Sequence, residues 1–236
     1  AQHAGHSSVW RLMSMSASSK KFVRLCGAKL VAFASLVIAP FVLAMPTMTS
    51  GSSEFVLFDW TRDQTSSGWS AVDDWVMGGV SRSRMRWDAA GHAVFEGRVS
   101  LENNGGFASV RTMVASPIPA DKDTFVVRVR GDGKRYALMF RTDRTFDGVA
   151  YHAGFVAPAS SATADGWTTV RLERNKFVAK FRGRLINAPP LKFEHVRQIG
   201  LMVSDGQSGE FRLEVARIVA DSAPRAEGSS TVELGR

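Results

Sequence analysis

Two neighbouring aspartates, Asp73 and Asp74, are the residues that could most directly do chemistry in this chain. They begin the run DDWVMGGVSRS over residues 73–83, and His152 is one of the few histidines that follow them. A carboxylate and an imidazole that reach one substrate can act as general base and general acid, which would support hydrolysis. Adjacent residues seldom aim both carboxylates at one substrate. The pattern therefore favours a loop in which the aspartates cap backbone N–H groups and the paired glycines permit a bend, with a recognition loop as the alternative.

A second polar run, ENNGGFASVR over residues 102–111, combines asparagines, paired glycines and an aromatic residue. Asn-Gly is a turn signal, so a hairpin is one interpretation. The other is a polar loop that contacts a ligand beside Phe107, because ligand pockets combine aromatic walls with a few polar groups. The sequence leaves both interpretations open.

Arg141 is a third candidate. In the run RYALMFRT over residues 135–142 it alternates away from the apolar face, so it is either solvated or a buried partner of Asp73 or Asp74. Breaking a buried pair of this kind would cost roughly 3–5 kcal/mol. Behind it, His152 is better explained as a hydrogen-bonded strand residue than as a proton shuttle.

Motifs for nucleotide-driven and metal-dependent chemistry are absent from the sequence. It contains no Walker phosphate loop, no dinucleotide-binding glycine fingerprint, no Gly-x-Ser-x-Gly elbow and no His-Glu-x-x-His motif. Cys26 is the single cysteine, and three scattered histidines follow residue 53: His92, His152 and His195. We therefore expect no enzyme activity, no metal site and no cofactor.

The net charge of +8 is concentrated near the N-terminus. Residues 1–53 carry five basic and no acidic residues, which leaves 25 basic and 22 acidic residues in the remainder. A remainder with so small a net charge does not indicate a nucleic-acid partner.

Residues 1–53 have the composition of a leader and linker. The run LVAFASLVIAPFVLAM over residues 30–45 follows a basic flank and is short for a membrane span, so it suits a secretory signal cleaved after Ala44, or an anchor. A mitochondrial presequence is the alternative, because residues 7–24 hold six serines and no acid. Because the chain begins at Ala1, Met13 and Met15 are alternative start positions. We expect any membrane contact to be made through this leader alone.

From Glu54 onward, short β-rich runs with period-two alternation predict strands. Asp-Gly and Asn-Gly steps between them indicate tight hairpin turns; one is Asp205-Gly206, in a core hairpin over 200–213. Only Phe193–Gln198 resembles a helical turn. The predicted strands are Phe55–Trp60, Ala93–Ser100, Phe107–Thr112, Thr124–Arg130, Arg135–Thr142, Ala150–Ala157, Trp167–Leu172, Ile199–Ser204 and Phe211–Ile218.

This number of short strands predicts one all-β domain over residues 54–220, a jelly-roll β-sandwich of two antiparallel sheets. The polar, small residues over 221–236 predict a disordered tail.

Four segments together resemble the complex I intermediate-associated protein 30 family. They are DDWVMGGVSRS (73–83), FEGRVSLENNGGFASVR (95–111), RGDGKRYALMFRTD with FDGVAYHAGF (130–155) and IGLMVSDGQSGEFRLEV (199–215). The resemblance implies a galactose-binding-like jelly roll and a chaperone-like role in assembling respiratory complex I (NADH:ubiquinone oxidoreductase). It supplies no catalytic residues. If the leader exports the protein, that role comes into doubt.

The expected function is therefore non-catalytic binding. One hypothesis is an assembly factor whose partners are respiratory complex I subunits or intermediates, or another membrane protein complex; the alternative is a carbohydrate-binding module of an exported protein. The candidate contact residues come from loops 73–83 and 103–111, with Arg141. They are Asp73, Asp74, Trp75, Met77, Gly78, Gly79, Asn103, Asn104, Gly105, Gly106, Phe107, Arg111 and Arg141.

Overall fold

The computed structural model describes residues 54–162 and 164–222. The predictions for the leader over 1–53 and for the tail after residue 222 lie outside the described residues. Among the residues described, no helix is both long and apolar enough to cross a membrane.

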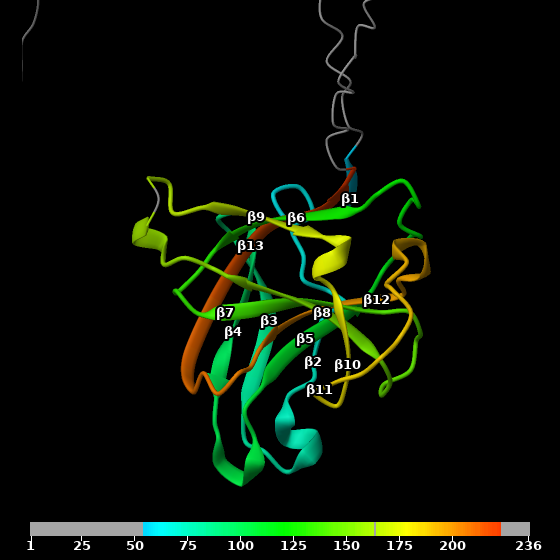
Figure 1. Ribbon diagram of the computed structural model, residues 1–236. Coiled ribbons are helices and arrows are strands. Elements are labelled where there is room, and N and C mark those ends of the chain that lie inside the picture. Colours follow the sequence, from blue (N-terminus) through cyan, green and yellow to red (C-terminus); the bar gives the residue numbers. More distant parts are fainter. Residues whose placement is uncertain (1–53, 163, 223–236) are drawn as a thin grey trace, which may run out of the picture. The chain divides into compact units, whose positions relative to one another are not determined.

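The described strands form two antiparallel sheets, shown in Figure 1. Sheet A has the order β3-β4-β13-β6-β9, with β1 also paired to β13. Its strands are β1 (Phe55–Asp59), β3 (Arg82–Asp88), β4 (His92–Val99), β6 (Thr124–Arg130), β9 (Thr168–Glu173) and β13 (Gly209–Asp221).

Sheet B has the order β11-β10-β8-β7-β12-β5-β2. Its strands are β2 (Ser70–Ala71), β5 (Ala108–Met113), β7 (Arg135–Arg141), β8 (Ala150–Val156), β10 (Val178–Phe181), β11 (Arg184–Leu185) and β12 (Gln198–Val203). The prediction of an all-β jelly-roll sandwich is confirmed.

The core lies between the sheets and follows the alternation in the sequence. Phe125 of β6 and Phe140 of β7 have ring centroids 4.4 Å apart, so aromatic side chains of the two sheets meet directly. Phe193 lies in the 3₁₀ turn η5 (Phe193–His195), and its ring centroid is 4.5 Å from that of Phe125. The predicted inward residues are all buried: Phe125, Val127, Val129, Tyr136, Leu138, Phe140, Phe211, Leu213 and Val215.

The hairpin interpretation of the turn signals is wrong at most positions. Asp205-Gly206 adopts positive φ as expected, but it carries the chain from β12 of sheet B to β13 of sheet A. Asn104-Gly105-Gly106, Asp132-Gly133 and Asp165-Gly166 also connect strands of different sheets. Positive φ reverses the chain equally well within a sheet and between sheets, so the residues reveal the turn but not the partner of the next strand.

Strand β3 begins at Arg82, inside the segment interpreted as a loop over 73–83. Its arginines give the run a polar composition, yet Met85 and Trp87 pack against the core on the other face. The loop therefore ends near Ser81, and the residues after it belong to sheet A.

Candidate functional site

Asp73 ties the start of β3 to β5. Its side chain is 2% exposed and accepts hydrogen bonds from Ser83 N (2.7 Å), Ser83 Oγ (2.5 Å) and Ser109 N (2.9 Å). Because Ser83 lies in sheet A and Ser109 in sheet B, this carboxylate links the two sheets.

Asp74 holds two loops together. It is 0% exposed and opens the 3₁₀ turn η1 (Asp74–Met77). Its carboxylate accepts from Ser81 N (2.9 Å), Ser81 Oγ (2.5 Å), Gly106 N (2.7 Å) and Phe107 N (3.3 Å). In Figure 1, η1 (cyan) accordingly lies beside the loop that follows β4 (green).

The paired glycines make this packing feasible. A Cβ on Gly105 would lie 2.6 Å from Asp74 Oδ2, and one on Gly79 would collide with the same carboxylate. Gly78 and Gly106 adopt φ values of 91° and 140°, which strain other residues. Gly79 and Gly105 therefore leave room for the buried carboxylate, and Gly78 and Gly106 permit the backbone turns of the two loops.

The two carboxylates have opposite pKa shifts. Burial raises the pKa of Asp73, and its hydrogen bonds from Ser83 and Ser109 offset this only in part. Burial also acts to raise the pKa of Asp74, but the hydrogen bonds from Ser81, Gly106 and Phe107 outweigh it and lower the value. Both aspartates cap backbone groups, so the hypothesis of hydrolysis by Asp73 or Asp74 with His152 is wrong.

A groove of about 490 Å³ lies on the outer face of sheet B, opposite the core. Its rim carries exposed apolar side chains from η1 and from the β7–β8 loop: Val76, Met77 and Phe146. Its floor includes Met139 and Met202, which point away from the core. Four basic and two acidic side chains line it: Arg111, Arg141, Lys180, Arg182, Asp147 and Asp205.

One row of the groove floor is fixed by strand register. Arg111 of β5 pairs with Gly200 of β12, Gly200 with Met139 of β7, and Met139 with His152 of β8. A Cβ on Gly200 would lie 2.9 Å from the Met139 methyl and 3.1 Å from Arg111 Cγ. The bare Gly200 backbone thus lets the arginine stem and the methionine lie close together.

Arg141 is buried, with its side chain 5% exposed, and it contacts neither Asp73 nor Asp74. Its guanidinium donates to Asp143 Oδ1 from Nη2 (3.3 Å), to the Phe146 carbonyl oxygen (3.2 Å) and to Thr145 Oγ1 (3.2 Å). Both alternatives considered for Arg141, solvation and pairing with the aspartate loop, are wrong. It organises the β7–β8 loop that carries Phe146.

His152 is held neutral in the groove. Burial, followed by the charges of Lys180 and Arg111, lowers the pKa of His152 to about 4, and Asp205 opposes the shift only weakly. His152 adds no positive charge to the groove near neutral pH.

The predicted site residues separate into three groups. Met77, Phe107, Arg111 and Arg141 line the groove. Trp75, Asn103 and Asn104 are exposed but do not line it. The third group surrounds or includes the buried carboxylates: Asp73, Asp74, Gly78, Gly79, Gly105 and Gly106.

Sequence analysis missed Met139, Met202 and Lys180 as groove residues. Met139 and Met202 alternate with the core-facing residues of their strands, so they lie on the outer face of sheet B. The signal that could have revealed them was that these strands carry apolar residues on both faces. Lys180 lies on β10, a short strand with no clear sequence signature.

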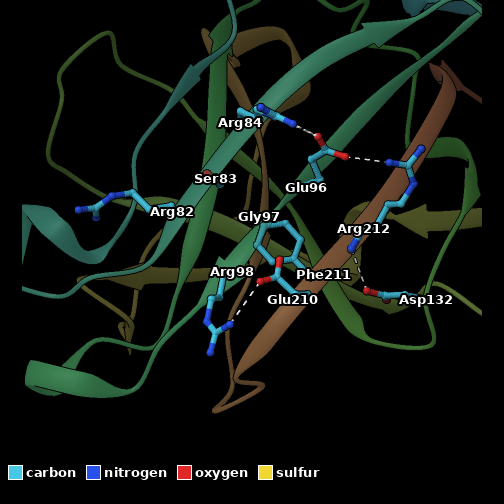
Figure 2. A pocket seen from close by; sticks show the side chains of 10 residues that line it. All are labelled: Arg82, Ser83, Arg84, Glu96, Gly97, Arg98, Asp132, Glu210, Phe211 and Arg212. Atoms are coloured by element: carbon cyan, nitrogen blue, oxygen red, sulfur yellow. Dashed lines mark hydrogen bonds and ion pairs between the residues drawn. The ribbon is translucent and has the colours of Figure 1, made fainter.

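The outer face of sheet A offers a different hollow, shown in Figure 2. Five of its seven charged side chains form ion pairs with one another: Glu96 pairs with Arg84 (2.6 Å) and Arg212 (2.8 Å), and Arg98 pairs with Glu210 (3.4 Å). Such surface pairs contribute little individually. This face therefore offers a ligand fewer unmatched charges than the groove on sheet B. Across residues 54–162 and 164–222, no group of three acidic, histidine or cysteine side chains could hold a metal ion.

The fold and the groove define a galactose-binding-like jelly roll with a hollow on the outer face of one sheet. The chain belongs to the complex I intermediate-associated protein 30 family, because the model of that family matches residues 58–215. A relative named "Complex I intermediate-associated protein 30, mitochondrial", from Drosophila melanogaster, is 24% identical over 179 residues. The match covers 68% of this chain and 60% of the relative, so the chain spans only part of that protein's length.

Two similar solved structures come from Clostridium thermocellum. A family 11 carbohydrate-binding module in complex with a β-1,3-1,4-mixed-linked tetrasaccharide has a TM-score of 0.52 at 13% identity, covering 72% of this chain and 96% of its own. The family 11 module of the cellulosomal cellulase Lic26A-Cel5E has a TM-score of 0.53 at 11% identity, covering 73% and 97%. At these identities the likeness shows the fold alone.

We predict that Asp74→Asn lowers the free energy of unfolding by about 3 kcal/mol, because an amide NH₂ would face donors that now meet a carboxylate. Asparagine and aspartate have nearly the same size, so the substitution leaves no cavity. The loss of stability therefore reports the lost hydrogen bonds. Chemical denaturation measures it, and amide hydrogen exchange should speed up at Gly106 and Phe107. The exposed Asp63→Asn is the control and should change stability by less than about 0.5 kcal/mol. Equal stability of the two variants would contradict the structure.

We predict that His152 makes the protein less stable as the pH falls. Between its ordinary pKa of 6.5 and its folded value of about 4, the unfolded chain binds a proton that the folded chain does not. From about pH 7 to about pH 5, the wild type should lose about 1–2 kcal/mol more than His152→Gln. The exposed His195→Gln should behave like the wild type. Denaturation curves at both pH values measure this, and parallel losses in wild type and His152→Gln would refute it.

Proposed function

We propose that this chain is a non-catalytic, chaperone-like assembly factor that binds a protein segment in the groove on sheet B. Its partners are respiratory complex I subunits or intermediates, or those of another membrane protein complex. Membership of the complex I intermediate-associated protein 30 family supports the proposal, as does the name of the Drosophila relative.

The observation that carries the proposal is the amphipathic character of the groove. Large apolar side chains stand exposed at and beside its rim, with Trp75, Met77 and Phe146 at 56%, 61% and 62% exposure. A monomeric domain gains nothing by exposing such residues together, and exposed apolar patches commonly mark interaction sites. The basic side chains of the floor would select acidic groups on the bound segment.

We propose a mitochondrial location. The name of the Drosophila relative and the serine-rich, acid-free composition of residues 7–24 support it. Export through the apolar run over residues 30–45 is the alternative.

We predict that the double variant Met77→Ser/Phe146→Ser folds normally but weakens partner binding about tenfold or more, because both side chains are exposed anchors. In the test, each variant is expressed in a deletion strain, and assembled complex I is measured on native gels. Subunits cross-linked to the variant are identified by mass spectrometry. Val56→Ser/Val156→Ser removes exposed apolar groups that do not line the groove and should complement fully. Normal complex I in the deletion strain, with no subunit recovered, would overturn the proposal.

A carbohydrate-binding module of an exported protein is the second candidate. The fold shared with the tetrasaccharide-bound module supports it, and the groove has room for a short glycan. It predicts weak binding of a β-1,3-1,4-linked tetrasaccharide in calorimetry, reduced by Phe146→Ser. A flat titration, or a mature chain found in the mitochondrial matrix, would reject it.

A further inference from the structure

Arg111 is a partly buried charge in the groove that lacks an ion-pair partner among the described residues. Its Nε is buried and has no hydrogen-bond partner among the described residues. The hydrogen bond shown for its guanidinium runs from Nη1 to the Phe146 carbonyl oxygen, at 3.3 Å. Within residues 54–162 and 164–222, no carboxylate forms an ion pair with it. A partly buried guanidinium in this state has lost water contacts without gaining a matching anion.

Arg141 brings a second positive charge to the same point. Its Nη1 also donates to the Phe146 carbonyl oxygen, at 3.2 Å, so the two guanidinium groups converge on one acceptor. Asp143 contacts Arg141 at 3.3 Å and is the only carboxylate within ion-pair distance of either group among the described residues. Burial, and after it the charge of Arg141, lowers the pKa of Arg111, and the charge of Asp147 opposes this shift. The two guanidinium groups therefore share a single ion-pair partner, Asp143, and keep an excess positive charge.

We propose that the Arg111–Arg141 pair is a carboxylate-binding subsite, which takes an acidic side chain of the protein segment bound in the groove. This inference rests on the proposed function. Apolar neighbours of that acidic residue would pack on Met139, Met202 and Phe146, which line the same groove. The occupant is thus a protein segment in which an aspartate or glutamate stands between apolar residues.

The surroundings favour a carboxylate over a phosphate or a neutral sugar. The planar guanidinium fork matches the two oxygens of a carboxylate. Asp147 and Asp205 also line the groove and would repel a doubly charged phosphate more strongly than a singly charged carboxylate. A neutral sugar would leave the excess charge of Arg111 unmatched.

The first arm of the test measures stability of the full chain. Arg111→Met keeps the aliphatic stem over Gly200 and removes the buried charge, so the melting temperature should stay equal to the wild-type value or rise. Arg141→Met, which leaves Asp143 without its partner, should lower it. A clear fall in melting temperature for Arg111→Met would show a structural arginine and overturn the subsite.

The second arm measures binding by NMR at fixed ionic strength, through the arginine Nε–H signals. The probes are acetyl-Leu-Glu-Leu-amide, its Gln counterpart and inorganic phosphate. The Glu peptide should shift the Arg111 signal and bind about tenfold more tightly than the Gln peptide. Arg111→Met should abolish that preference, while Arg98→Met on sheet A should retain it.

Equal binding of the Glu and Gln peptides, or a response to phosphate alone, would overturn the carboxylate assignment; the latter would point to a phosphate-bearing ligand such as a lipid headgroup. The complementation assay separates this failure from failure of the proposed function. If Met77→Ser/Phe146→Ser blocks complex I assembly but Arg111→Met supports it, the groove functions and the subsite is rejected.

Discussion

The buried carboxylates of Asp73 and Asp74 hold together three segments that the sheets alone would leave separate. Three hydrogen bonds to Asp73 and four to Asp74 connect the start of β3, the loop after β4 and the start of β5. Hydrogen bonds to a charged group contribute about 1.5–3 kcal/mol each, and leaving the buried amides unpaired would cost a comparable amount. Gly79 and Gly105 are required because the carboxylate of Asp74 occupies the space beside them, and Gly78 and Gly106 are required because their φ values are positive.

This arrangement positions side chains of the proposed binding groove, although the two carboxylates do not line it. Met77 ends the turn that Asp74 begins, and Phe107 donates its amide to Asp74, so both groove residues are fixed by the carboxylate. In the β7–β8 loop, Arg141 donates a hydrogen bond to the carbonyl oxygen of Phe146 and so fixes the backbone of that residue. Apolar side chains are therefore held exposed by buried polar contacts, which keeps them from collapsing into the core. A preorganised binding surface of this kind loses little entropy when a partner arrives.

Sequence alone predicted the sandwich well because period-two alternation records which face of a strand meets the core. Thr124–Arg130 and Arg135–Arg141 show this directly, since their alternating residues are buried. The predicted loops around Asp73 and Asn103 proved adjacent, but which of their residues face outward depends on the hydrogen bonds of Asp74. The groove itself was not predictable, because Met139, Gly200 and Arg111 become neighbours only through the strand order of sheet B. Arg141 misled the prediction because its acidic partner, Asp143, is local rather than distant.

Site-specific photocross-linking tests most directly the claim that the groove on sheet B is the protein-binding surface. A benzoylphenylalanine replacing Phe146 reports contacts at the groove, and one replacing Val56 reports contacts on sheet A. The proposed function predicts that irradiation in living cells links position 146, but not position 56, to a subunit of a membrane protein complex such as respiratory complex I. Adducts from position 56 alone, or equal adducts from both positions, would contradict the assignment of the groove.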